Sequence, residues 1–243
     1  MIQIEDFKVV KDKKIRFLYE TISEHLNYVF NTDDMELLNS YIKRVLSYLN
    51  GYTEKDKLFS HLRKTNFDHP YLFLQWLIEY AKFKIEYIKQ PKIKRFDDLL
   101  LYSNNQSTYG FLFLITDNLA ARHINIISNI AKIDILTYIL KHDNALKLSG
   151  KIHYPLQLIE DYGLDYSFEN TYMKNEAYTA LFEMIHFKIE GYIKTLTASL
   201  DYFKDHESLV IKNFINVRKD YLQSQRKSLI DHLNKEKTIN NIF

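Results

Sequence analysis

Apolar residues recur at three- and four-residue spacing along almost the whole chain. The first such stripe, at Phe17, Ile22, Leu26 and Val29, predicts a helix over about residues 13–30. The same spacing predicts further helices over about 33–49, 55–64, 71–88, 97–104, 108–116, 119–141, 155–162, 175–205 and 208–233. Because the 243 residues include only five Gly and three Pro, we expect these helices to be long and uninterrupted.

Capping and breaking residues mark where the predicted helices begin and end. Thr32 or Asp33 is suited to cap the second helix at its N-terminus, and Gly51 closes it. We expect the first two helices to pack as an antiparallel pair. Pro91 ends the helix over about 71–88, and the polar run at 104–107 predicts a break.

The chain reads as one domain. With 46% hydrophobic side chains, 243 residues can build one substantial core, and no repeat or linker divides them. We therefore assign residues 1–243 to a single all-α domain and expect 1–12 and 235–243 to be flexible ends.

Composition excludes several classes of function. A net charge of +2 offers no basic footprint for nucleic acid, and the lack of cysteine excludes disulfides, thiolate catalysis and cysteine-ligated metals. The 19 Tyr and 16 Phe can line a core, a pocket or a partner interface, and the core is the favoured reading.

Neither a membrane span nor a targeting signal can be read from the chain. The apolar run at 109–115 is far shorter than the ~20 residues that cross a bilayer. The basic residues between 218 and 237 are diluted by acids, which favours a solvated helix face and leaves peripheral membrane association as the alternative. Residues 1–16 carry acids among their lysines, unlike an Arg-rich presequence.

Standard catalytic motifs are missing, and the acidic pairs have a simpler explanation. The sequence holds no glycine-rich phosphate loop, no HExxH zinc helix and no GxSxG elbow. Asp33-Asp34 and Asp97-Asp98 could hold Mg²⁺ against a diphosphate. Both pairs immediately precede predicted helices, so we expect them to cap those helices.

One stretch carries a family resemblance. A helix ending in Tyr138-Ile139-Leu140-Lys141 is followed by Gly150-Lys151-Ile152-His153-Tyr154-Pro155 and then Gly163. This resembles the squalene/phytoene synthase family, in which an Asn-Ile-Leu-Arg-Asp helix precedes a basic residue, an aromatic or apolar step, Leu-Pro and a later Gly. The segment at 99–112 with Tyr102-Ser103-Asn104-Asn105 also resembles the family's Leu-x-x-Tyr-Cys helix junction.

The resemblance spans about residues 17–226 and implies the fold of that family, a single-domain isoprenoid-synthase-like helical bundle. It also implies where the family's Mg²⁺-binding aspartates belong. The first Asp-rich motif falls on Lys82 and Glu86, and the second falls on His142 and Leu146. Only one carboxylate remains at four ligand positions, and Mg²⁺ usually needs more than one. We therefore expect no metal, no cofactor and no enzymatic activity.

Among members of the fold, this pattern most resembles the non-catalytic branch represented by the mitochondrial complex I assembly factor. That resemblance implies an assembly factor or accessory subunit of a mitochondrial respiratory complex, with protein partners in the matrix or on the matrix face of the inner membrane. The alternative is an active isoprenyl-diphosphate transferase with rearranged ligands.

The resemblance further implies a helical interior that related synthases use for isoprenoid tails. We expect Tyr102, Phe111 and Tyr138 to line this space, without a converging acidic rim. Side chains that fill the space would stabilise a core that has no catalytic task. A bound lipid or quinone is the alternative occupant.

Overall fold

The computed structural model describes residues 7–52, 56–65, 67–89, 94–116, 118–148, 154–165 and 171–240. Positions 57–58, 87–89, 102–106 and 236–240 are described by their backbone alone. The described ranges form helices joined by turns and contain no strand, which confirms the predicted all-α class.

The helices follow one another with short connections. In chain order they are α1 (Lys13–Asn31), α2 (Met35–Leu49), α3 (Lys57–Arg63), α4 (Pro70–Lys89), α5 (Phe96–Ile115), α6 (Ala121–Leu148), α7 (Leu156–Asp161), α8 (Glu176–Thr197), the 3₁₀ turn η2 (Leu200–Tyr202) and α9 (Asp205–Asn240).

Acidic side chains lie at the starts of α2 and α5, but the N-cap of α2 is Asp34 and not the expected Thr32 or Asp33, and α5 has no side-chain cap. The carboxylate of Asp34 caps α2 by accepting hydrogen bonds from the backbone N–H groups of Glu36, at 2.7 Å, and Leu37, at 3.1 Å. Asp97 and Asp98 lie in the first turn of α5, where acids complement the helix dipole. At the other end of α2, Gly51 has a φ of 83°, a left-handed conformation that glycine adopts without strain.

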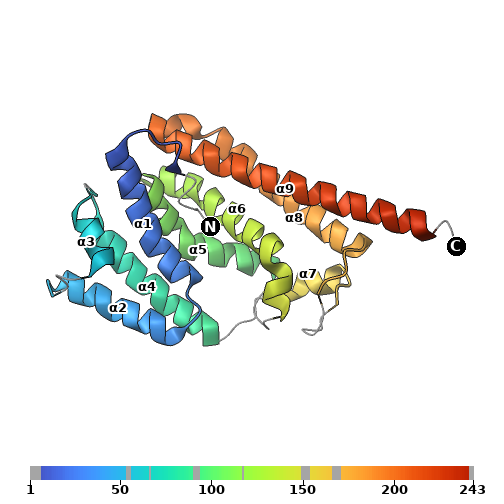
Figure 1. Ribbon diagram of the computed structural model, residues 1–243, viewed down its shortest axis with the longest axis horizontal. Coiled ribbons are helices and arrows are strands. Elements are labelled where there is room, and N and C mark those ends of the chain that lie inside the picture. The colour runs from blue at the N-terminus through green and yellow to red at the C-terminus, as the bar shows by residue number, and fades with distance from the viewer. Residues whose placement is uncertain are drawn as a thin grey trace.

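The helices pack in an order that places α5 and α6 at the centre (Figure 1). These two form an antiparallel hairpin; α4 and then α2 pack on the α5 side, and α8 and then α9 pack on the α6 side. Helix α1 crosses α3, α4 and α5. The C-terminal part of α9 extends past the body of the molecule (Figure 1).

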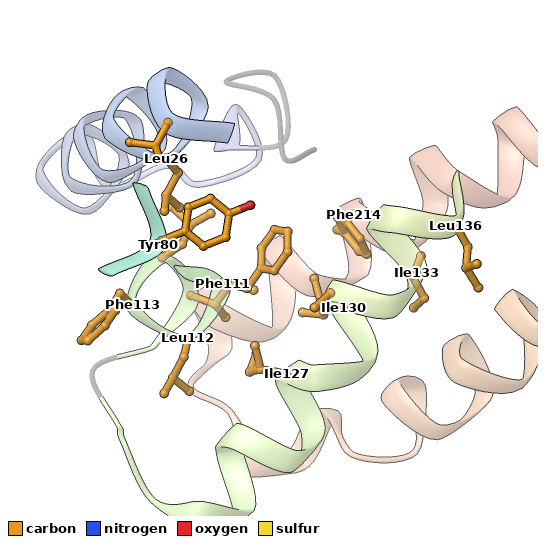
Figure 2. Close-up of a cluster of buried hydrophobic side chains, with 14 of the residues drawn as sticks. Leu26, Tyr80, Phe111, Leu112, Phe113, Ile127, Ile130, Ile133, Leu136 and Phe214 are labelled. Carbon is orange, nitrogen blue, oxygen red and sulfur yellow. The ribbon is translucent and has the colours of Figure 1, made fainter. Parts of the chain in front are cut away.

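One continuous core joins the two sides of the hairpin. It is apolar and buried because the inward stripes of the helices meet there. Figure 2 shows its central part, drawn from α1, α4, α5, α6 and α9: Leu26, Tyr80, Phe111, Leu112, Phe113, Ile127, Ile130, Ile133, Leu136 and Phe214.

Several boundaries differ from the sequence expectations. The polar run at 104–107 does not break the chain, because α5 continues from Phe96 to Ile115. Helix α2 packs mainly on α4, and it meets its expected partner α1 through side chains, such as the rings of Tyr28 and Tyr41 stacked at 4.9 Å. At the expected flexible ends, the Phe7 side chain is buried and stacked on Tyr19 at 5.2 Å, and α9 continues to Asn240.

Several of the described helices are long, such as α6 with 28 residues and α9 with 36. None of them combines the length and the apolar content needed to span a bilayer.

Candidate functional site

The first pair of motif positions lies on the outer side of α4. The Lys82 ammonium pairs with the Glu79 carboxylate at 2.8 Å, and their side chains are 57% and 70% exposed. Glu86 is also exposed. At the same level, α4 buries Tyr80 and Lys84 among neighbouring apolar side chains. The inward face of this helix is therefore mostly apolar, and it includes the cation of Lys84.

Lys84 has a structural task. Its Nζ donates hydrogen bonds to the backbone carbonyls of Val29, at 3.1 Å, and Phe30, and lies 3.3 Å from a carboxylate oxygen of Asp33. The last carbonyls of a helix have no partner within the helix itself. Lys84 thus completes the C-terminus of α1 from a neighbouring helix.

The second pair of motif positions lies on α6 and is half-buried. The ring of His142 packs against that of Tyr138, with centroids 4.7 Å apart. Burial, and then the charge of Lys141, lower the pKa of His142. Leu146 is half-buried one turn further along. At this level of α6, the residue that follows each of these two is buried more deeply.

The buried charged residues in the described part of α6 are Asp143 and Lys147, each one position beyond the expected site. Asp143 is 5% exposed, and Lys147 is completely buried. With Leu136 and Leu140 they continue the inward stripe of α6 at three- and four-residue spacing. We call Asp143, Lys147, Tyr154, Tyr172 and Tyr178 the Asp143 cluster.

Asp143 is held by two tyrosine hydroxyl groups. Its Oδ2 accepts hydrogen bonds from Tyr178, at 2.6 Å, and Tyr154, at 3.1 Å, and its Oδ1 accepts one from the N–H of Asn144 at 2.7 Å. Burial is the main cause that raises the pKa of both phenols, and the negative charge of Asp143 adds to it. The phenols therefore stay protonated and keep donating.

Lys147 lies beside this carboxylate network. Its Nζ is 3.3 Å from an Asp165 carboxylate oxygen and 4.2 Å from the centroid of the Tyr172 ring, which is a cation–π distance. The N–H of Tyr172 donates to the Asn144 side chain at 2.7 Å. The Tyr172 ring lies 5.5 Å from Tyr154 and 6.0 Å from Tyr178.

This arrangement does not fit a Mg²⁺–diphosphate site. Mg²⁺ prefers octahedral coordination by oxygen, usually with more than one protein or phosphate group. Here the inward carboxylate already accepts three hydrogen bonds, and the next inward residue on α6 is an ammonium. Within the described ranges, no group of three or more His, Asp or Glu side chains converges on one point.

The predicted cavity-lining residues lie in different environments. Phe111 is part of the central core (Figure 2). Its ring meets the Phe30 ring edge-on, with centroids 6.2 Å apart. Tyr138 is half-buried beside His142. The side chain of Tyr102 lies outside the described residues, although its backbone belongs to α5.

Comparison with known proteins identifies the fold. No family model and no curated protein matches the chain. Among solved structures, a ligand-bound dehydrosqualene synthase superposes with a TM-score of 0.70 at 12% identity, over 98% of this chain and 91% of that one. YisP from Bacillus subtilis subsp. subtilis strain 168 superposes with a TM-score of 0.52 at 17% identity, over 90% and 91%. The chain therefore has a squalene-synthase-like all-α fold.

Proposed function

We propose that this protein is a non-catalytic protein of the squalene/phytoene synthase fold that acts by binding other proteins. The observation that carries the proposal is the Asp143–Lys147 pair. A buried ammonium follows the inward carboxylate of α6 by one turn, and that carboxylate accepts hydrogen bonds from two tyrosines. An ammonium close to a divalent cation is strongly unfavourable in a buried site.

The inward face of α4 supports the same proposal. Its buried cation, Lys84, is bonded to the carbonyls that end α1. A positive charge fixed there by the packing of two helices cannot turn away to make room for a metal ion. A buried cation thus lies on the inward face of each of the two helices for which the family resemblance predicts Asp-rich motifs, and on α6 it lies one turn from Asp143.

The resemblance in the sequence extends this proposal to a task. On that basis we infer an assembly factor or accessory subunit of a mitochondrial respiratory complex, with complex I as the first candidate. The location that follows is the matrix or the matrix face of the inner membrane. A lipid or quinone within the helical interior stays a prediction of the same resemblance.

Catalysis can be tested directly. The purified full chain is incubated with farnesyl or geranylgeranyl diphosphate and millimolar Mg²⁺, beside an active dehydrosqualene synthase as the positive control, and extracted products are counted by mass spectrometry. We expect no product above the no-protein background. More than one product molecule per protein, lost in Asp143→Asn, would show the alternative, a transferase with rearranged ligands.

Metal binding gives a second, independent measurement. Calorimetry with Mg²⁺ or Mn²⁺, with and without inorganic diphosphate, should show no saturable binding at millimolar metal.

Identifying the partner needs the protein in its native cells. Affinity purification followed by mass spectrometry should recover subunits of a respiratory complex, and their absence from all purifications would contradict the assigned task but not the lack of catalysis.

A further inference from the structure

A groove runs along the outer face of α4 and is separate from the Asp143 cluster. It has a volume of about 830 Å³, with α4 as its floor and with residues of α2 and α5 on either side. Four of its large apolar or aromatic side chains are more than two-fifths exposed: Leu46 at 46%, Tyr71 at 59%, Leu72 at 45% and Tyr109 at 42%. They come from three helices and converge on one concave surface.

The floor of the groove is held in a fixed shape. The Trp76 ring lies 5.2 Å from Tyr80 and 6.5 Å from Phe73, and it rests against Gly110 of α5. A Cβ atom at residue 110 would lie 2.6 Å from the Trp76 ring, so only glycine admits this close packing. Rigid, aromatic surfaces of this kind lose little entropy on binding and are typical of interface hot spots.

The charges along the groove identify the kind of occupant. Glu79 and Lys82 stand on adjacent turns of α4, and Asn50 and Gln75 add neutral polar groups. One acid and one base in balance provide no attraction for an anionic membrane surface, which favours clusters of Lys and Arg. Glu79 and Lys82 match a partner helix that places a basic residue opposite Glu79 and an acidic residue opposite Lys82. An exposed ion pair opens at little cost to make such contacts.

We propose that this groove binds an amphipathic α-helix of a partner protein. Apolar residues at helical spacing on the partner pack on Leu46, Leu72 and Trp76, and its basic and acidic groups face Glu79 and Lys82. Helices bind apolar grooves in this way when residues one and two turns apart act as anchors. The inference deepens the proposed function by naming the face and the partner, and it rests on that function only in requiring a binding partner.

The first experiment maps contacts in the native cells. A photo-crosslinking amino acid replaces Tyr71 or Tyr109 in the full chain, and Leu209 of α9, which is exposed to a similar degree at 41%, serves as the control position. We expect one protein to be captured at both groove positions and not at 209, through a segment with an apolar helical stripe. Capture of a second copy of this chain, capture of lipid alone, or no capture above the control would each overturn the proposal.

The second experiment measures affinity with a defined probe, a synthetic peptide of the captured segment. Its binding to the purified chain is followed by fluorescence anisotropy and its helicity by circular dichroism. Leu72→Glu and Leu46→Glu should each weaken binding by at least about tenfold, because they place a charge in the apolar contact. Leu209→Glu should change it by less than about twofold. Equal effects of groove and control variants, or binding by a peptide that stays unstructured, would overturn the proposal.

Failure here is distinguishable from failure of the proposed function. Product formation from prenyl diphosphates would refute the lack of catalysis whatever the groove binds. Loss of crosslinking without any product would refute the helix-binding face alone. Circular dichroism melts of each variant check that the fold is intact, which is expected because Leu46 and Leu72 are exposed side chains.

Discussion

At the scale of single residues, two glycines within helices show how much depends on the surrounding packing. Gly110 of α5 lies against the Trp76 ring, and its position also approaches Leu26 at 3.1 Å. Gly191 of α8 is exposed, and an added Cβ would meet nothing within 4 Å. The same substitution therefore has opposite consequences at the two positions.

Gly110→Ala should lower the free energy of unfolding by about 1–3 kcal/mol, since overpacking forces a large ring to move. Gly191→Ala should raise it by about 0.5–1 kcal/mol, because alanine loses less backbone entropy in a helix. Urea titrations of both variants beside the wild type measure the difference. A neutral Gly110→Ala would show that Trp76 is not fixed as the groove requires.

At the scale of elements, α1 depends on α4 for its C-terminus. The helix ends without a basic residue in its last turn, and Lys84 supplies the donor from outside. This cap was not predicted from the sequence, because a lysine 55 positions away carries no local signal.

Lys84→Met should lower the free energy of unfolding by about 1–3 kcal/mol, because the carbonyls of Val29 and Phe30 lose a buried donor. Lys82→Met on the same helix is the matched control. It breaks only an exposed ion pair and should change stability by less than about 0.5 kcal/mol. Chemical denaturation distinguishes the two, and equal effects would contradict the cap.

At the scale of the whole molecule, the Asp143 cluster connects α6 to α8 and to the segment that precedes α7. Tyr178 belongs to α8, Tyr154 precedes α7, and Tyr221 of α9 has its pKa raised to about 12 by burial and by the charge of Asp143. Ionising any of these phenols places a second negative charge near Asp143. The contacts of α6 with α8 and with the segment before α7 should therefore weaken at alkaline pH.

The sign follows from proton linkage. A folded-state pKa above the unfolded value means that the native chain holds protons that the unfolded chain has released, so stability is complete below about pH 10 and falls above it. For Tyr221 the loss extends from about pH 10 to about 12. Tyr221→Phe should reduce the slope of the unfolding free energy against pH in this range by up to the contribution of about one proton.

Urea midpoints measured from pH 9 to 12 test this prediction. Tyr178→Phe should likewise reduce the alkaline slope, and its own stability at pH 7 should fall by about 1–3 kcal/mol because Asp143 loses a donor. Tyr52→Phe, which alters a tyrosine that is 82% exposed and far from the cluster, is the control. An unchanged slope in Tyr221→Phe would contradict the linkage.

The sequence by itself determined the helical class, the succession of helices and the approximate position of most of their starts, because these depend on local spacing and polar capping residues, although the cap of α2 is Asp34 and not the expected Thr32 or Asp33. It also indicated the fold through the segments around Tyr138 and Tyr154. The break expected at 104–107 was wrong, since tertiary packing overrides weak local propensity and α5 runs through it.

Only the tertiary structure decided which residues face the interior. Successive residues of an α-helix are rotated by about 100°, so a shift of one position moves a side chain from the inner face to the flank. That rotation separates the half-buried His142 and Leu146 from the buried Asp143 and Lys147. The two tyrosines that donate to Asp143, Tyr154 and Tyr178, lie 11 and 35 positions away from it along the chain. Lys147 pairs with Asp165, which lies 18 positions away, and with the ring of Tyr172. Contacts at such separations leave no periodic signal, and they form only because packing brings the helices together.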